Sequence, residues 1–300
     1  FKYHPAGERA RRADLVNGVV TETLEGRGPI YCDCTHLPEA DVRRLVNTLG
    51  VDRPALPDFF AQKRIDLARE PFEVTMSEIA TVRAGALFRG AGVHIDAECA
   101  SSIPGLFAAG DCCTMNAGVA GAAVMGQVAG ESAARYALSQ PPPEPLSSEE
   151  RERIRETLFR PLHLEDGLEF RQFEDEVREI VTGYIGYWRD EERLREALRR
   201  LQALWSQEGD MMAQDFHGVM RVNEARNIRA VAEAIAASAI ERRETRGGAA
   251  HIRVDYPETD DENGRRIIMV EQAEDTLRVS VRPTGIPAAV LPALPKELKS

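Results

Sequence analysis

The chain has 300 residues, of which 43% are hydrophobic, so the sequence favours two domains with enough apolar material for buried cores. Acidic residues outnumber basic ones by 49 to 38, and the net charge of −11 argues against a nucleic-acid partner. The apolar stretches are too short for a membrane span and no segment has signal-peptide layout, so we expect a cytoplasmic protein.

Two helices and a short strand are expected in the first part of the chain. Apolar residues recur at helical spacing over 8–25, and glycines together with Pro29 end that helix. Residues 30–34 alternate as in a short strand. Residues 38–49 predict a second helix, with Pro38 near its first turn and Gly50 as its C-cap.

The next segment combines extended chain with a helix of small residues. Residues 71–96 are expected to be extended, and residues 106–109 form a compact apolar strand that ends at Gly110 and Asp111. Residues 118–138, rich in alanine and glycine, predict a helix. Because each glycine inside it costs about 1 kcal/mol of helix propensity, we expect another segment to pack closely against it.

A proline-rich stretch over 141–145 forms a stiff linker and the clearest domain boundary. Beyond it, amphipathic helices are expected from Ser148, the predicted N-cap, and over 169–188, 191–205 and 213–243. Helices of this kind form a bundle. Residues 266–271 and 276–282 predict a polar β-hairpin at the end.

The cysteines form an odd set without C-x-x-C spacing. This argues against a disulfide framework and against a cysteine-ligated zinc or iron–sulfur centre, so no metal site is predicted. Buried thiols are the expected arrangement. The residues concerned are Cys32, Cys34, Cys99, Cys112 and Cys113.

The segment with the most chemical information is 105–111, Gly-Leu-Phe-Ala-Ala-Gly-Asp. A strand that ends in glycine and an acid exposes a carboxylate at the carboxyl edge of a sheet, where open α/β sheets bind nucleotides. That carboxylate can accept a hydrogen bond from a ribose or ribityl hydroxyl, and the next helix points its amino-terminal N–H groups at the same crevice. The alternative is a strand–turn–helix packing unit with an aspartate N-cap, and spacing alone does not separate the two.

Four separated segments resemble the succinate dehydrogenase/fumarate reductase flavoprotein superfamily, in that family's order. Residues 103–111 are similar to the signature before its second FAD-contacting segment, and residues 125–131 to the helix that follows. Residues 27–33 (RGPIYCD) are similar to its capping-domain "RGPVYLD" strand. Residues 242–247 and 253–261 are similar to its "R-x-E-S-R-G … R-x-D-Y-P … D-D" element.

The resemblance implies an FAD-dependent oxidoreductase that moves a hydride or electrons between a small-molecule substrate and a redox partner, a ferredoxin-like iron–sulfur subunit. It implies that Gly110 and Asp111 lie at the FAD ribityl chain, and that backbone N–H groups of Gly118, Val119 and Ala120 face the isoalloxazine ring. The implied fold is mixed α/β, with partial Rossmann-like FAD-binding and capping segments, then a helical bundle with a small β-hairpin tail.

Two departures from the family concern the substrate. Dicarboxylate-handling members have a histidine in an "HYTMGG" segment and an arginine in "GANRLGSNSL", whereas residues 85–92 and 115–123 here have neither. A succinate-like dianion would lose its charge-assisted contacts, so another substrate is expected. The compact loop resembles the adenylylsulfate-reductase-like branch. No catalytic residue is assigned; Arg89 is a candidate for binding an anion, the alternative being a surface or FAD-phosphate arginine.

Other chemically notable residues are expected to be structural. Arg243, Glu244 and Arg246 predict an ion-pair cluster that braces the bundle, with His251 buried beside it. Cys112 and Cys113 directly follow Asp111, but adjacent cysteines rarely form a relaxed disulfide, which favours packing over electron exchange with a flavin.

No G-x-G-x-x-G follows a strand, and the chain starts at Phe1, so we expect a missing amino-terminal FAD-binding half and little or no FAD binding by this chain alone. The alternatives are a non-catalytic fragment that acts as an interaction module, or one half of a split flavoprotein. The predicted domains are the rest of the capping domain (1–84), the end of the FAD-binding domain (85–140), a linker (141–147), a helical bundle (148–250) and a β-hairpin tail (251–300).

Overall fold

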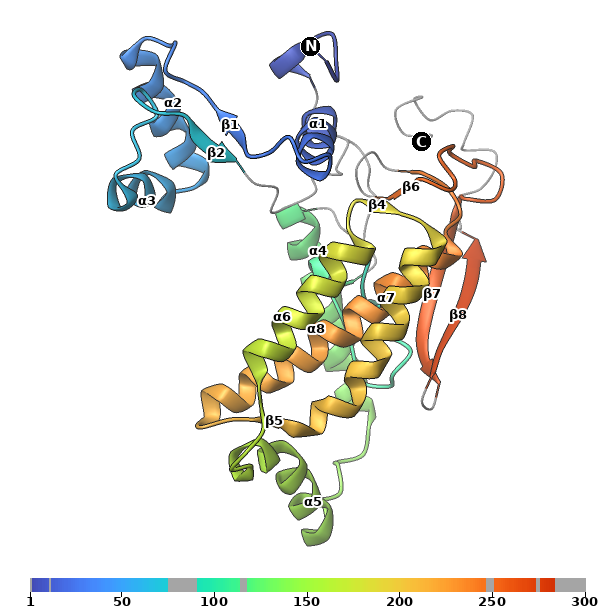
Figure 1. The fold of residues 1–300 in the computed structure, drawn as a ribbon. Coiled ribbons are helices and arrows are strands. Elements are labelled where there is room, and N and C mark those ends of the chain that lie inside the picture. The colour runs from blue at the N-terminus through green and yellow to red at the C-terminus, as the bar shows by residue number, and fades with distance from the viewer. Residues whose placement is uncertain are drawn as a thin grey trace. The chain divides into compact units, whose positions relative to one another are not determined.

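The computed structural model describes residues 2–10, 12–74, 91–113, 118–246, 251–273 and 276–283. The chain forms two compact units, each with its own internal contacts (Figure 1). The first unit comprises Phe1–Thr81 and Gly248–Ala250, and the second comprises Val82–Gly247 and His251–Ser300.

The first unit is a small helical body with a two-stranded sheet. It contains η1 (Gly7–Arg9), α1 (Arg12–Leu24), β1 (Ile30–Cys32), α2 (Glu39–Asp52), α3 (Ala55–Lys63) and β2 (Phe72–Val74). Strand β1 pairs antiparallel with β2, so that Ile30 lies opposite Val74. Helices α2 and α3 cover a core of Cys34, Val42, Phe60 and Leu67.

Two sequence predictions in this unit are wrong. Gly50 lies inside α2 and does not cap it, because the helix continues to Asp52. Helix α3 was not predicted, since its segment contains prolines. Pro54 precedes the helix and Pro57 lies in its first turn, where a missing N–H group removes no helical hydrogen bond.

In the second unit, the segment before the first long helix is irregular. The expected strand over 106–109 is wrong: within it Phe107 makes one antiparallel bridge, to Ala100. A turn in which the Leu106 amide bonds to the Ile103 carbonyl folds the chain back on itself. Asp111 therefore follows a tight chain reversal and lies in the 3-10 turn η2 (Gly110–Cys112). Helix α4 (Gly118–Ser139) follows and confirms the predicted helix over 118–138.

Residues 141–147 have no regular structure, and the helical bundle follows them. Its elements are α5 (Ser148–Phe159), η3 (Arg160–His163), β3 (Leu168–Glu169), α6 (Phe170–Ile180), η4 (Val181–Ile185), β4 (Trp188–Arg189), α7 (Glu191–Leu204), η5 (Trp205–Asp210), β5 (Met211–Met212) and α8 (Phe216–Glu241). Helices α6, α7 and α8 pack together (Figure 1). Their shared core includes Phe173, Val177, Leu194, Leu201 and Val222.

Three details of the bundle differ from the predictions. Helix α6 ends at Ile180, well before residue 188, because a π-helical turn and Gly186 redirect the chain. The N-cap of α5 is Ser147 and not Ser148. Trp205, expected in the buried stripe of α7, is 39% exposed and lies under the guanidinium of Arg229.

Short strands tie the bundle together and a hairpin follows it. Strand β3 pairs with β5, and β4 pairs with β6 (Ile252–Arg253), both in parallel. Strands β7 (Arg266–Ala273) and β8 (Thr276–Pro283) form the predicted antiparallel hairpin, which packs against α8.

The expected mixed architecture is therefore confirmed for the bundle and the hairpin. The Rossmann-like part is not: within the described ranges every sheet is two-stranded. In that part of the chain, none of the helices combines the length and apolar character that crossing a bilayer requires.

Candidate functional site

The turn that carries Asp111 depends on a glycine. Gly110 is buried, its φ is +79°, and a Cβ atom there would lie 3.3 Å from the Cβ of Ala122 on α4. A left-handed backbone and close contact with α4 both favour glycine at this position. Gly110 thereby seats the turn on α4, and Asp111, the next residue, is exposed.

The carboxylate of Asp111 is available to a ligand. No hydrogen bond or ion pair from the other described residues engages it, although residues 114–117 lie outside those ranges. The expected alternative, a packing unit with an aspartate N-cap, is not what this turn forms: the side chain caps none of the described helix ends, and α4 starts later, at Gly118.

The start of α4 is exposed beside this turn along the chain. Gly118 has φ +63°, Val119 is 90% exposed and Ala120 is also exposed. The first amides of a helix lack acceptors within the helix and carry partial positive charge. An acceptor with partial negative charge would therefore be stabilised at this end of α4.

Helix α4 presents a largely open surface. Among its residues Met125 and Ser132 are buried, whereas Val124 and Leu138 are 65% and 88% exposed. A Cβ atom at Gly126 or at Gly130 would meet nothing within 4 Å. The expectation that a segment packs closely on these glycines is therefore not met within the described residues.

The expected burial of the thiols holds for three cysteines. Cys34, Cys99 and Cys113 are buried, whereas Cys32 and Cys112 are exposed. Arg89, the candidate for binding an anion, lies outside the described residues. In the ranges that are described, no group of three or more His, Cys, Asp or Glu side chains could hold a metal ion.

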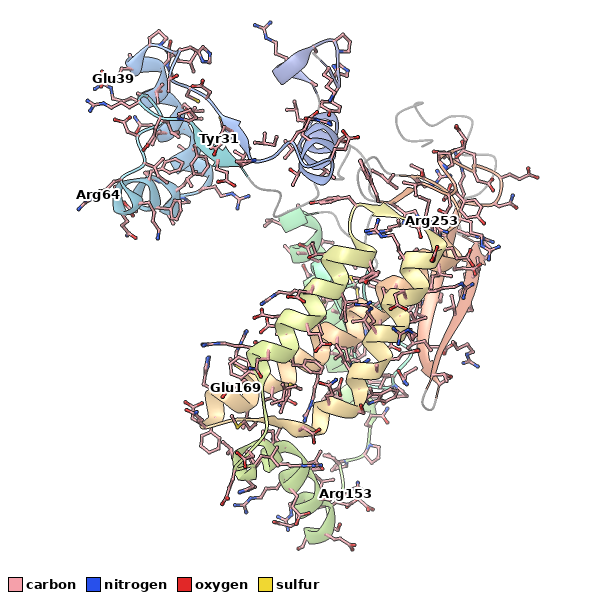
Figure 2. The ribbon with its side chains drawn as sticks, in the orientation of Figure 1. Tyr31, Glu39, Arg64, Arg153, Glu169 and Arg253 are labelled. Atoms are coloured by element: carbon pink, nitrogen blue, oxygen red, sulfur yellow. The ribbon has the colours of Figure 1, made fainter. Side chains whose placement is uncertain are left out.

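A second cluster of functional groups lies at the end of the bundle where β4 and β6 meet (Figure 2). Arg253 is fully buried, and its Nη1 donates to the carbonyl oxygens of Ala239 (2.7 Å) and Arg242 (3.1 Å) at the end of α8. Its Nε and Nη2 donate to the Asp255 carboxylate at 2.8 and 2.7 Å. Asp255 also accepts from the backbone N–H of Glu191, at the start of α7. Both charges thus complement helix dipoles.

His251 is held in its neutral form beside Arg253. Its Nδ1 lies 2.9 Å from Nη1 of Arg189, and its Nε2 lies 3.0 Å from the carbonyl oxygen of Arg242. An arginine can only donate and a carbonyl can only accept, so the ring carries its proton on Nε2. Burial, with the nearby arginine charges, lowers the pKa of His251 to about 4, although the hydrogen bond to the Arg242 carbonyl raises it.

Glu244 is the centre of the predicted ion-pair cluster and is only 2% exposed. Arg242 and Arg246 hold it at 2.7 and 2.9 Å. Burial raises the pKa of Glu244, but the hydrogen bonds and charge of these arginines keep it below its ordinary value. Arg243, the predicted partner, points elsewhere and lies 3.8 Å from Glu191.

The alternation of Arg242, Glu244 and Arg246 was the signal for this pairing, because alternate side chains of an extended segment lie on one side. The sequence prediction missed Arg242, Arg189 and Asp255. The cluster joins helix ends through paired polar groups, so its role is to fix the bundle.

Comparison with known proteins identifies this part of the chain. Residues 174–296 match the family model of the fumarate reductase flavoprotein carboxy-terminal region. This region belongs to that family. The residues it covers include α7, α8 and the Arg253 and Glu244 clusters.

The chain as a whole is similar to larger flavoproteins. It is 29% identical to a protein of the fumarate reductase (CoM/CoB) of Methanothermobacter marburgensis, over 91% of this chain and 49% of that protein. In structure it resembles the quinol fumarate reductase of E. coli, with a TM-score of 0.75, 22% identity, and coverage of 97% of this chain and 52% of that one. The adenylylsulfate reductase of Archaeoglobus fulgidus gives 0.72, 21%, 94% and 52%.

These comparisons confirm the resemblance found in the sequence. The chain spans about half the length of the relatives it matches. The likeness to both solved structures is one of fold, and it does not separate the fumarate reductase branch from the adenylylsulfate reductase branch.

Proposed function

We propose that this chain forms one side of an FAD site in a flavoprotein oxidoreductase. The observation that carries the proposal is the exposed, unengaged carboxylate of Asp111 on a turn that Gly110 seats against α4. Such a carboxylate can accept a hydrogen bond from a ribityl hydroxyl. The first amides of α4, at Gly118, Val119 and Ala120, would stabilise the electron-rich edge of the flavin ring. FAD-dependent oxidoreductases among the relatives support this choice of cofactor.

The proposed activity is transfer of a hydride or electrons between a small substrate and a redox partner. FAD, when bound, supplies the electron-transfer chemistry, while Asp111 and the α4 amides hold and orient it. Residues 85–92 lack the family's histidine and residues 115–123 lack its arginine, which favours a substrate other than succinate or fumarate. Arg89 is the proposed anion contact.

The proposed partners follow from what this chain does not carry. A polypeptide with a G-x-G-x-x-G fingerprint would hold the FAD pyrophosphate, and a ferredoxin-like subunit would carry the iron–sulfur centres. A cytoplasmic location remains a prediction.

An FAD titration tests the site. We expect weak or no FAD binding by the chain alone, and a flavin absorbance band when the polypeptide with the pyrophosphate fingerprint is added. Asp111→Ala should weaken that binding about tenfold or more, since a hydrogen bond to a charged group contributes about 1.5–3 kcal/mol.

Asp58→Ala is the matched control, because Asp58 is an exposed aspartate on α3 in the first unit. It should leave the FAD affinity unchanged. Stoichiometric FAD on the isolated chain would contradict the expected half-site, and equal affinities for Asp111→Ala and wild type would contradict the role of Asp111.

A second candidate function, an interaction module without catalysis, has one observation in its favour. The outer side of α8 exposes the apolar residues Met220, Val231 and Ile235, at 47%, 58% and 43%. Absence of FAD binding even with the second polypeptide present would favour this function over the flavoprotein.

A further inference from the structure

Two cysteine sulfurs lie in contact at the end of β1, in the first unit. The Sγ atoms of Cys32 and Cys34 are 3.8 Å apart. Cys32 is the last residue of β1, and Tyr31 before it marks the strand in Figure 2. A disulfide needs a sulfur–sulfur distance of about 2.0 Å, so a shift of about 2 Å would join them.

The backbone after Cys32 holds the second sulfur in place. The Asp33 carboxylate accepts hydrogen bonds from the backbone N–H and the hydroxyl of Thr35, at 2.9 and 2.7 Å. The Leu37 amide bonds to the Cys34 carbonyl at 3.0 Å and closes a turn. The chain therefore leaves the extended conformation of β1 at this point, and the two thiols approach each other.

The two thiols differ in access to solvent. Cys32 is exposed, whereas Cys34 is 6% exposed and packs in the core with Val42, Phe60 and Leu67. An exposed cysteine next to a second, protected one is the arrangement of a redox-sensitive pair, in which one thiol reacts first and the other resolves the adduct.

We propose that Cys32 and Cys34 form a reversible disulfide with a low-molecular-weight disulfide as the oxidant. The Cys32 thiolate attacks one sulfur of the oxidant, whose S–S bond breaks and releases a thiolate that takes up a proton. The Cys34 thiolate then attacks the Cys32 sulfur of the mixed disulfide and releases the second thiol. Two electrons pass from the cysteines to the oxidant, and two protons accompany them.

The other cysteines do not share this arrangement. Cys99 and Cys113 are buried, and burial raises the pKa of Cys99, which reduces its thiolate fraction. Cys112 is exposed, but its neighbour Cys113 is fully buried with its thiol donating to the Gly110 carbonyl. Oxidation should therefore select the pair on β1.

Peptide mass spectrometry of the full chain after incubation with oxidised glutathione tests the proposal. Trypsin releases residues 28–43 as one peptide that holds Cys32 and Cys34 and no other cysteine. We expect this peptide to lose two hydrogens and to resist alkylation, and to recover both thiols after reduction. The peptide 90–135, which holds the other three cysteines, serves as the internal control.

The dependence on glutathione concentration separates the disulfide from a mixed adduct. At a fixed ratio of reduced to oxidised glutathione, an about tenfold higher total should lower the ratio of disulfide to dithiol about tenfold, because two glutathione thiols are released. A mixed disulfide would show no change. That flat response in the wild-type chain, or full alkylation of both thiols, would overturn the proposal.

Single substitutions test the order of the steps. Cys34→Ser should stop at a glutathione adduct on Cys32, and Cys32→Ser should leave Cys34 unmodified. Because serine in the core can impair folding, Cys34→Ala provides a second form of the first variant. Faster reaction of Cys34 than of Cys32 would refute the assigned order.

Discussion

Buried charged side chains in the bundle are paired with helix ends. Arg253 donates to carbonyls at the end of α8, and Asp255 accepts from the first amide of α7. His251 joins the same site as a neutral group between Arg189 and the Arg242 carbonyl. A buried histidine in this setting stabilises the fold only while it stays neutral.

The pH dependence of stability tests that assignment. The pKa of His251 falls from its ordinary value of 6.5 to about 4 in the folded chain, so below pH 6.5 the unfolded state binds the extra proton. Its contribution is present above pH 6.5 and is lost as the pH falls to 4. We expect the free energy of unfolding, relative to His251→Gln, to drop by about 2–3 kcal/mol over this range.

The measurement is urea denaturation at several pH values. His217→Gln, a change at an exposed histidine on α8, is the control and should track the wild type. If the profile of His251→Gln also ran parallel to that of the wild type, His251 would not be a buried neutral group.

At the scale of elements, α5 depends on its ends more than on a core. None of its residues is buried. The Ser147 hydroxyl accepts from the Glu150 amide at 3.1 Å, and the Glu150 carboxylate accepts from the Ser147 amide at 2.9 Å. This reciprocal capping box satisfies two amides that would otherwise lack partners.

Loss of this cap should loosen α5. An N-cap contributes about 1 kcal/mol, so we expect Ser147→Ala to raise amide hydrogen exchange in residues 148–159 about fivefold. Ser148→Ala is the matched control and should change the exchange little. A larger effect of Ser148→Ala would return the cap to the residue that the sequence pattern indicated.

At the scale of the whole molecule, each unit has its own apolar core. The bundle core contains Leu194, Leu201 and Val222, and the core of the first unit contains Val42 and Phe60. Separate cores allow separate unfolding, because each unit buries its own apolar surface.

Core truncations test this independence. Leu201→Ala should lower the stability of the bundle by about 2–5 kcal/mol and leave amide exchange in residues 12–74 unchanged. Phe60→Ala should do the reverse, with a loss of about 3–5 kcal/mol in the first unit. Equal responses of both units to either change, followed by hydrogen exchange, would show that they unfold as one body.

Elements whose signals are local were predictable from the sequence. Helices α4 and α7 and the β7–β8 hairpin follow from composition, from the spacing of apolar residues and from turn residues between the strands. The flavoprotein family was also accessible, since its motifs lie in short continuous segments. The position of Asp111 at a turn before α4 belongs to this group.

Tertiary structure decided what depends on residues far apart in the chain. The pairing of Arg189 with His251 spans 62 positions, and strands β4 and β6 have two residues each, too few for a sequence pattern. The strand expected over 106–109 became a tight reversal because no neighbouring strand within the described residues pairs along it. Local propensity is small beside packing and long-range hydrogen bonds, so the sequence alone determined which helices form, while the packing of the chain determined which side chains meet.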